Sequence, residues 1–566
     1  MEATQMLKKS LVTLAILANT MAITACSSDD DKNSAPTGIN LATTSVDENE
    51  VGAVIGQLTA VDSDSNDTHT FTLDDARFEI SGVQLSLASD IALNYEVEST
   101  VTVNVTTTDS EGNSFSSDLT IDVNDVLDRY DFGERVSYTG QVARQLLILE
   151  LNNYIDSQLT TDLNNNVLTT RDEVIAKLMS FYKMTSDEYV LETSQNPLTV
   201  ATTPSAVQTI LADVSSSLKD LSGKIAGNDA TGQHKDWSTE FVAFGDKGTR
   251  TPEQEIIRLF NLIADNAEEE FFNGNARTDA FGDTITKVYL SDDGLDYKQL
   301  IQKILLGAVN FSQGTDDYLD NNIDGKGLLS THVVEAGSSY SALEHQFDEG
   351  FGYFGAARDY LEYSDDEISI KGGRDDYQGM HDTNGDDEID FTSEYIFGHA
   401  ANAAKRDRGT VTNAAPTDFT SDAMNAFLIG RKLLADTAGT ELTDQQMADL
   451  IAQRDIAVAA WEKAIAATVV HYINDTLGDY AAFATDSFSY SDLAKHWSEL
   501  KGFAISLQFS PFSPLTPTQH EQVNQLIGDA PELVSDNVDS YKADLLQAQG
   551  ILATAYAFDA ENVTNW

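Results

Sequence analysis

The sequence predicts a multidomain protein in which a small all-β sandwich precedes a large all-α domain built from helical bundles. The chain has 566 residues, which is more than one domain usually holds. Short segments rich in β-branched residues, separated by acidic turns, occupy residues 39–127 and indicate strands. Across residues 129–566 the apolar residues recur with the period of a helix instead.

The first 25 residues have the form of an export signal. A basic start, an apolar run over residues 11–21 and a short box over residues 23–26 follow one another, and the box ends on Cys26, the only cysteine of the chain. The apolar run is too short to span a bilayer. The pattern resembles a bacterial lipoprotein signal, which implies cleavage before Cys26 and lipidation of that residue.

The lipoprotein resemblance implies a lipid anchor in the cell outer membrane, because Ser27 and not an aspartate follows the cysteine. The protein would then face either the periplasm or the cell surface. Residues 26–38 are polar and aperiodic, so we expect a flexible tether there. The expected partners are the membrane itself and an outer-membrane receptor or another envelope protein.

The β segment is expected to have strands at residues 53–61, 68–73 and 100–106. Its acidic motifs resemble those of a cadherin repeat, a family in which such acids bind calcium at the two ends of the domain. A competing interpretation is that these acids only solubilise turns. The calcium ligands that the resemblance implies are Glu48, Asp62, Asp64, Glu96, Asp109 and Asp125.

The rest of the chain is expected to fold as an all-α domain of packed bundles. Several segments begin with helix-start signals such as Thr251-Pro252, Thr443-Asp444 and Thr516-Pro517. The longest segment is rich in alanine and is expected to be a buried central helix. The expected helices cover residues 141–151, 205–225, 252–270, 297–312, 340–348, 392–406, 421–436, 443–477, 490–508, 517–527 and 540–557.

Two histidine-carboxylate strings are the sharpest chemical signal in this domain. On a helix, His345 and Glu349 share one face, and a second string holds His496 three residues before Glu499. Imidazole with carboxylate suits iron or another transition metal, and facing helices can share one ion. Packed, hydrogen-bonded histidines remain the alternative. The predicted ligands are His345, Asp348, Glu349, His496 and Glu499.

An acidic loop that begins at residue 382 has the ligand spacing of an EF-hand-type calcium loop. It departs from that pattern at the sixth place, where Asp387 replaces the turn glycine, and at the twelfth, where Ser393 precedes the glutamate by one residue. The alternative is an acidic turn that caps a helix. The predicted calcium ligands are Asp382, Asn384, Asp386, Glu388, Asp390 and Glu394.

Three strings, at residues 344–355, 382–407 and 496–502, together resemble a bacterial lipoprotein family catalogued as a domain of unknown function, number 4856. The resemblance covers residues 130–566 and implies a fold without a chemistry. A more distant similarity is to imelysin-like proteins, helical envelope proteins that are often regulated by iron and carry Gly-x-His-x-x-Glu. Here Leu343 and Ala494 stand at the glycine positions, and Asp348 replaces the first glutamate.

The net charge of the chain favours some classes of function and argues against others. Lysine and arginine number 34 against 92 aspartate and glutamate residues, a formal charge of −58, which repels nucleic acid and attracts cations. We therefore rank first a metal-binding envelope lipoprotein for iron or haem acquisition with structural calcium sites. A non-catalytic calcium-dependent adhesion or scaffold protein ranks second. A metal-dependent hydrolase ranks last, because His-Glu-x-x-His and Gly-x-Ser-x-Gly motifs are absent from the sequence.

Overall fold

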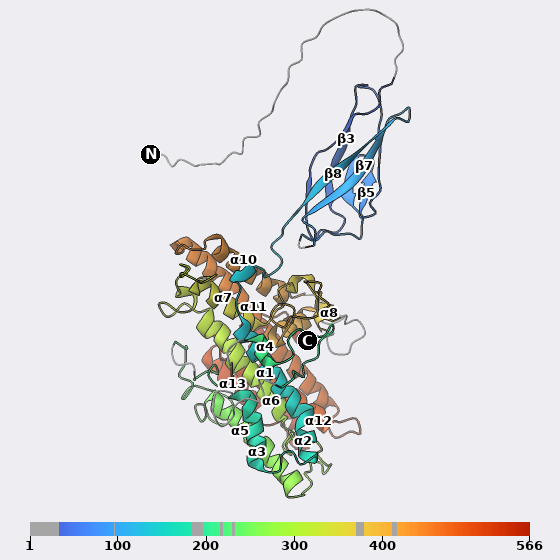
Figure 1. The fold of residues 1–566 in the computed structure, drawn as a ribbon. Coiled ribbons are helices and arrows are strands. Elements are labelled where there is room, and N and C mark those ends of the chain that lie inside the picture. Colours follow the sequence, from blue (N-terminus) through green and yellow to red (C-terminus); the bar gives the residue numbers. More distant parts are fainter. Residues whose placement is uncertain are drawn as a thin grey trace, which may run out of the picture. The chain divides into compact units, whose positions relative to one another are not determined.

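The computed structural model describes residues 33–95, 97–183, 196–215, 219–228, 232–369, 379–409 and 416–566. The chain divides into two compact units, Met1–Val126 and Leu127–Trp566 (Figure 1). The first unit holds β-strands and the second is mainly helical, so the predicted order of a β region followed by a large helical region is confirmed. Cys26 and Glu96 lie outside the described residues.

Two four-stranded sheets make up the described part of the β unit. Their strand orders are β1-β3-β6-β5 and β2-β8-β7-β4, and every pairing is antiparallel except that of β2 with β8. The expected strands at 53–61, 68–73 and 100–106 correspond to β3, β4 and β7. The bounds are β1 (Gly38–Leu41), β2 (Ser45–Asp47), β3 (Val54–Val61), β4 (Thr70–Leu73), β5 (Phe78–Ser81), β6 (Gln84–Leu87), β7 (Thr100–Thr108) and β8 (Ser114–Asn124).

The alternating pattern of β7 shows how the sequence builds this unit. Val101, Val103 and Val105 are buried, while Thr102 and Asn104 between them point to the other face. Leu85 of the other sheet belongs to the same hydrophobic cluster. The two sheets therefore enclose one common core, which is what strands with one apolar face require.

The helical unit contains one extensive hydrophobic core lined by most of its helices. Its longer helices are α1 (Thr139–Asn153), α3 (Arg171–Tyr182), α5 (Pro252–Ala267), α6 (Tyr297–Leu305), α7 (Ala342–Phe354), α9 (Gly398–Asp407), α10 (Phe419–Asp436), α11 (Asp444–Ala481), α12 (Tyr490–Ser506), α13 (Pro517–Ile527) and α14 (Val538–Ala555). Shorter elements are η1 (Gly133–Arg135), η2 (Tyr154–Gln158), α2 (Leu159–Asn164), α4 (Leu211–Val214), η4 (Glu268–Phe272), η5 (Leu306–Phe311), η6 (Gly314–Tyr318), η7 (Gly327–Leu329), η8 (Tyr360–Glu362), α8 (Asp365–Ser369), η9 (Ser535–Asn537) and α15 (Ala560–Asn565).

The predicted central helix is α11, which packs against α10 and α12 (Figure 1). Trp461 in its middle is fully buried. Of the helices in the described ranges, α11 is the one that is long and apolar enough to cross a membrane, but 72% of its apolar window is buried inside the protein. That burial is typical of a core helix of a folded domain.

Local capping signals in the sequence correctly mark several helix starts. Thr251, Thr443 and Thr516 each accept a hydrogen bond from the backbone N–H of a glutamine three residues later, and that glutamine side chain reciprocates. Such a capping box satisfies N–H groups that the first helical turn leaves without partners. The threonine-proline signals at α5 and α13 are therefore confirmed.

Two expected helices are shorter in the structure, and the helix expected at residues 340–348 is longer, because α7 continues to Phe354. In its described residues, 205–215 and 219–225, the segment expected at residues 205–225 holds only the short α4. Ala206 forms a bridge with Ile389, and the Leu198 N–H donates to the Thr209 carbonyl, so this backbone is committed to extended pairing. The helix expected at residues 392–406 begins only at Gly398 as α9. The preceding residues form turns closed by Glu394, as described below.

Candidate functional site

The carboxylates of α7 that resemble metal ligands belong to a buried ion-pair network. Arg431 of α10 donates through Nε to Oδ1 of Asp348 at 2.7 Å and through Nη1 to Oε1 of Glu344 at 2.8 Å. The Tyr130 hydroxyl and the Ser137 N–H also donate to Asp348, at 2.8 and 3.2 Å. Both oxygens of Asp348 are thereby occupied. We assign Asp348 a structural role in place of the ligand role expected from the sequence.

His345 and Glu349 lie together on α7, as their spacing predicts. The His345 Nε2 atom is 3.7 Å from Oε2 of Glu349, and its Nδ1 bonds to the Ser137 carbonyl at 3.0 Å. Gln141 donates to the other oxygen of Glu349 at 2.7 Å. The imidazole also stacks on Tyr340, with ring centroids 5.0 Å apart. These contacts place the pair at a partly exposed surface with protein partners of its own.

The second predicted pair is separated into two different contacts. His496 bonds through Nδ1 to Oδ2 of Asp479 on α11 at 2.9 Å. Glu499 lies 3.3 Å from the Lys303 ammonium on α6 and is 4% exposed. Each side chain therefore pairs with a different neighbouring helix.

The helices that carry these pairs also pack against different neighbours. α7 packs against α1 and α10, whereas α12 packs against α6 and α11. In the described ranges, no set of three His, Asp or Glu ligand atoms within 4.8 Å of one another includes His345 or His496. The structure therefore does not bring His345 and His496 into a common ligand set in these ranges.

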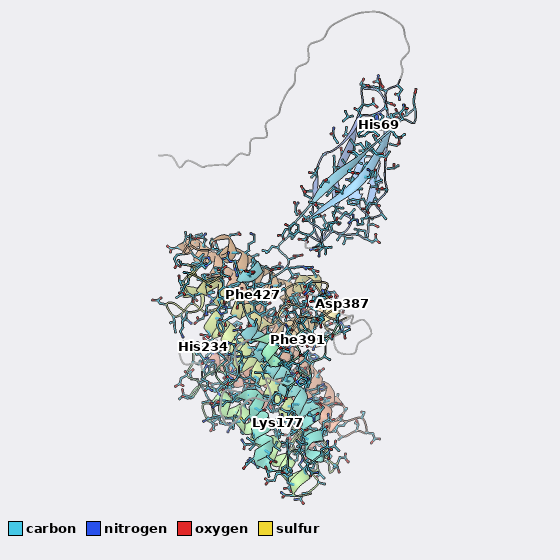
Figure 2. All side chains as sticks on the ribbon, in the orientation of Figure 1. His69, Lys177, His234, Asp387, Phe391 and Phe427 are labelled. Carbon is cyan, nitrogen blue, oxygen red and sulfur yellow. The ribbon has the colours of Figure 1, made fainter. Side chains whose placement is uncertain are left out.

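The acidic loop at residue 382 is ordered by its own side chains. Oδ1 of Asp382 accepts from the N–H groups of Gly385 at 2.7 Å and Asp386 at 3.2 Å, and Oδ2 accepts from Asp387 at 2.8 Å. Partial desolvation raises the pKa of Asp382, but these backbone donors outweigh it and hold the pKa below its usual range. Asp387, labelled in Figure 2, has φ +66°, the left-handed conformation that the turn glycine adopts in EF-hand-type loops.

The middle of the loop is fixed by two further features. The side-chain Oδ1 of Asn384 accepts a hydrogen bond from the Asp386 N–H, and Oδ1 of Asp386 accepts one from the Glu388 N–H, both at 2.9 Å. At the eighth place the buried Ile389 pairs its backbone with the strand-like segment before α4, donating to the Ser205 carbonyl at 2.9 Å. The first, third and fifth positions of the predicted calcium loop are therefore preorganised.

The end of the loop departs from the predicted ligand set. Glu394 is 1% exposed, and its oxygens accept from Thr383 N–H at 2.8 Å and from Asp390 N–H at 2.8 Å. Asp390 in turn accepts from Thr392 and from Gln208. Glu394, which stands one place later than the glutamate of an EF-hand, thus joins the two ends of the loop by accepting from their backbone N–H groups.

A cluster that the sequence reasoning missed lies directly before this loop. His381 bonds through Nδ1 to Oδ2 of Asp359 at 2.7 Å and through Nε2 to Oε1 of Glu367 at 3.2 Å. Asp359, Glu362 and His381 each bring a ligand atom within 4.8 Å of the other two. The signal available in the sequence was an aspartate one helical turn before a glutamate, with a histidine adjoining the acidic loop.

The environment of this cluster is partly buried and aromatic. The His381 ring stacks on Tyr363 at 3.6 Å with an interplanar angle of 6°. Burial lowers the pKa of His381, but the hydrogen bond and charge of Asp359, followed by those of Glu367, outweigh it and raise the pKa. Asp359 is 1% exposed, and its Oδ1 has no hydrogen-bond partner in the described part of the chain. An unsatisfied buried carboxylate oxygen is a strong acceptor for a cation.

Acidic residues of the β unit gather around His69, which Figure 2 labels. Asp62, Asp67 and His69 each bring a ligand atom within 4.8 Å of the other two, and His69 lies 2.9 Å from Asp62. Asp62 also accepts from the N–H of Asp64 at 3.0 Å. Asp67 and His69 were not predicted, and the missed signal was an Asp-x-His string five residues after Asp62.

Two of the remaining predicted ligands of the β unit, Asp109 and Glu48, accept hydrogen bonds from protein donors. Asp109 accepts from Asn113 through both oxygens, at 2.8 and 2.9 Å. Glu48 is buried and accepts from the N–H groups of Tyr95 and Val126, at 2.7 and 2.8 Å. Asp125 is exposed. Calcium binding by this set stays a prediction.

The fold and these sites define a two-unit protein whose helical unit carries a preorganised acidic loop beside a histidine-carboxylate cluster. The family model described as Domain of unknown function (DUF4856) matches residues 133–552. The chain belongs to this family, as the three strings predicted. A comparison with curated proteins finds no match.

Proposed function

We propose that this chain is a calcium-binding, non-catalytic scaffold lipoprotein of the cell envelope, anchored to the outer membrane through Cys26. The observation that carries the proposal is the order of the loop that begins at Asp382. Its side chains at the first, third and fifth places are held by backbone N–H groups, and Asp387 takes the left-handed turn. Oxygen ligands on such a frame suit calcium.

The charge of the chain supports this function. With a formal charge of −58, the folded state repels itself unless cations neutralise part of its surface. Calcium bound to the loop would neutralise the cluster of Asp382, Asp386, Asp387 and Glu388 locally. The cadherin-like acids of the β unit, among them Asp62 and Asp64, would add weaker sites. A receptor or another envelope protein is the expected partner.

A second function, transition-metal binding that would serve iron acquisition, is favoured at His381 and no longer at His345 and His496. Asp359, Glu362 and His381 supply an N/O ligand set that suits zinc or iron. Glu367 bonds to Nε2 of His381, the other ring nitrogen. It would hold the proton on Nε2 and leave Nδ1 of His381 to bind the metal. Arg129 forms an ion pair with Glu362, so it would compete with a metal ion for this carboxylate.

Titration calorimetry of the metal-stripped full chain with calcium and with zinc tests both functions. The variants are Asp382→Ala, His381→Ala and the control His496→Ala. His496 is a suitable control because it is also a half-buried histidine paired with an aspartate.

We expect Asp382→Ala to lose one calcium site and keep zinc, His381→Ala to lose zinc and keep calcium, and the control to keep both. If Asp382→Ala binds as many calcium ions as wild type, the loop is not a calcium site. Loss of zinc in His496→Ala, with zinc retained in His381→Ala, would restore the His345–His496 interpretation.

A further inference from the structure

A cavity of about 370 Å³ between α9, α11 and α12 gathers positive charge in a strongly acidic protein. Two sequence strings that lie far apart along the chain meet in it, one around Lys405 and Arg406 and the other around His496. Tyr472 and Trp566 add aromatic surface, and Asp475 is the acidic residue of the lining. The basic and histidine residues of the lining are Lys405, Arg406, Arg408, His471, Lys495 and His496.

Arg406 is the unusual member of this set. Its side chain is 7% exposed, and its Nε atom is buried without a hydrogen-bond partner. Across the described ranges its guanidinium takes part in no ion pair, and burial lowers the pKa of Arg406 to about 10. A buried charge with little compensation is unfavourable, and a bound anion is one way to satisfy such a buried donor.

The other basic and histidine side chains of the cavity are held differently. Arg408 forms an ion pair with Asp366 at 2.7 Å. His471 lies 3.2 Å from Asp475, and burial lowers the pKa of His471 to about 3, so its ring is neutral near pH 7. His496 is paired with Asp479, as described above. Arg406 is therefore a buried guanidinium in the lining that forms no ion pair in the described part of the chain, although the charges of Asp475 and Asp407 act on it.

We propose that this cavity binds a small organic anion, with a carboxylate or phosphate group on Arg406 and an apolar body against Tyr472 and Trp566. The planar guanidinium donates in a fork that matches both kinds of group. The volume is in the range of small-molecule sites and exceeds what a single inorganic ion fills. Lys495, an exposed residue at the same cavity, would add a second positive charge to the ligand. This site does not depend on calcium or on His381.

The test is a thermal-shift and calorimetric titration of the full chain with benzoate, phenyl phosphate and inorganic phosphate, each against sodium chloride at equal ionic strength. Benzoate and phenyl phosphate share an aromatic body and differ in the anion, so they distinguish the two sources. We expect one of them to raise the melting temperature and to bind at least tenfold more tightly than inorganic phosphate.

The key variant is Arg406→Met. It should abolish this binding while leaving the melting temperature of the ligand-free protein unchanged or higher, because it removes an unpaired buried charge; a purely structural arginine would lower it. Lys495→Gln, an exposed change, should weaken binding several-fold and serves if Arg406→Met does not fold. The proposal is overturned if neither organic anion exceeds the chloride control, or if Arg406→Met, or in its place Lys495→Gln, binds as tightly as wild type.

Discussion

Arg431 and Asp348 form an ion pair of 2.7 Å in which both side chains are completely buried, and it joins α10 to α7 across 83 residues of sequence. Burial raises the pKa of Asp348 even though Arg431 opposes the shift. Glu344, one turn earlier on α7, receives a second donor of the same guanidinium. Carboxylates that look like metal ligands in the sequence therefore already neutralise an internal cation.

Removing one partner of this pair should be costly. Asp348→Ala leaves the Arg431 charge only partly compensated, so we expect the free energy of unfolding to fall by about 3–5 kcal/mol. Urea denaturation followed by circular dichroism measures the change. Lys432→Ala is the control, on α10 next to Arg431. Its ion pair with Asp436 is exposed and should contribute less than about 1 kcal/mol to the free energy of unfolding. Equal losses in the two variants would contradict the assigned role of the buried pair.

The glycines of α7 allow close packing against neighbouring residues. A Cβ at Gly352 would lie 2.7 Å from the Cβ of Tyr138, so Gly352→Ala should destabilise the protein by about 1–3 kcal/mol. Gly478, inside α11, has no atom within 4 Å of that position, and Gly478→Ala should stabilise by about 0.5–1 kcal/mol. Thermal melts of the two variants should therefore shift in opposite directions, and a shared direction would contradict the packing.

Glu462 should impose a pH dependence on stability. Burial raises its pKa to about 7, and hydrogen bonds such as the 2.7 Å bond from Tyr556 only partly oppose this. The unfolded state releases this proton near the ordinary glutamate pKa of 4.5, whereas the folded state keeps it, so wild type should lose stability as pH rises from about 4.5 to 7. Glu462→Gln removes this contribution, about 3 kcal/mol over the window. Parallel stability–pH curves for the two proteins would show that Glu462 titrates normally.

Membrane attachment should depend on the single cysteine. Cys26→Ala removes the proposed acceptor of the lipid, so we expect the protein to move from the membrane fraction to the soluble periplasmic or culture fraction. Immunoblots of fractionated cells measure the distribution, with Cys26→Ala compared against Ser27→Ala. Persistence of the cysteine variant in membranes would contradict the lipid anchor.

Features encoded within a few residues could be predicted from the sequence. The alternation of Val101, Val103 and Val105, the threonine caps and the central helix all follow from local patterns. The position of the acidic loop could also be predicted from the sequence, because its side chains accept hydrogen bonds from backbone groups within five residues. Local physics is enough where the partners of a residue are its neighbours in the chain.

Features that depend on tertiary partners could not be predicted in this way. No residue near Asp348 in the sequence indicates that Arg431, 83 residues later, is its partner. In the same way, His381 forms a hydrogen bond with Asp359, which lies 22 residues earlier. The segment before α4 looked helical because its pairing with Ile389 lies far away in the sequence. For the same reason the sequence suggested metal ligands at His345 and His496, while the structure provides a closer ligand set around His381.

The calcium loop is tested most directly by the melting temperature of the full chain in calcium and in chelator, for wild type and for the double variant Asp382→Asn, Asp386→Asn. Binding to the native state alone adds about 2.7 kcal/mol when calcium is at roughly 100 times its Kd. Asp279→Asn is the control, since Asp279 orders an acidic turn in the same way, accepting from Phe281 and Asp283 N–H at 2.9 and 3.0 Å. Our account predicts a calcium-induced rise in wild type and in the control that is lost or strongly reduced in the double variant. Identical melting curves of wild type in calcium and in chelator, or an undiminished rise in the double variant, would contradict it.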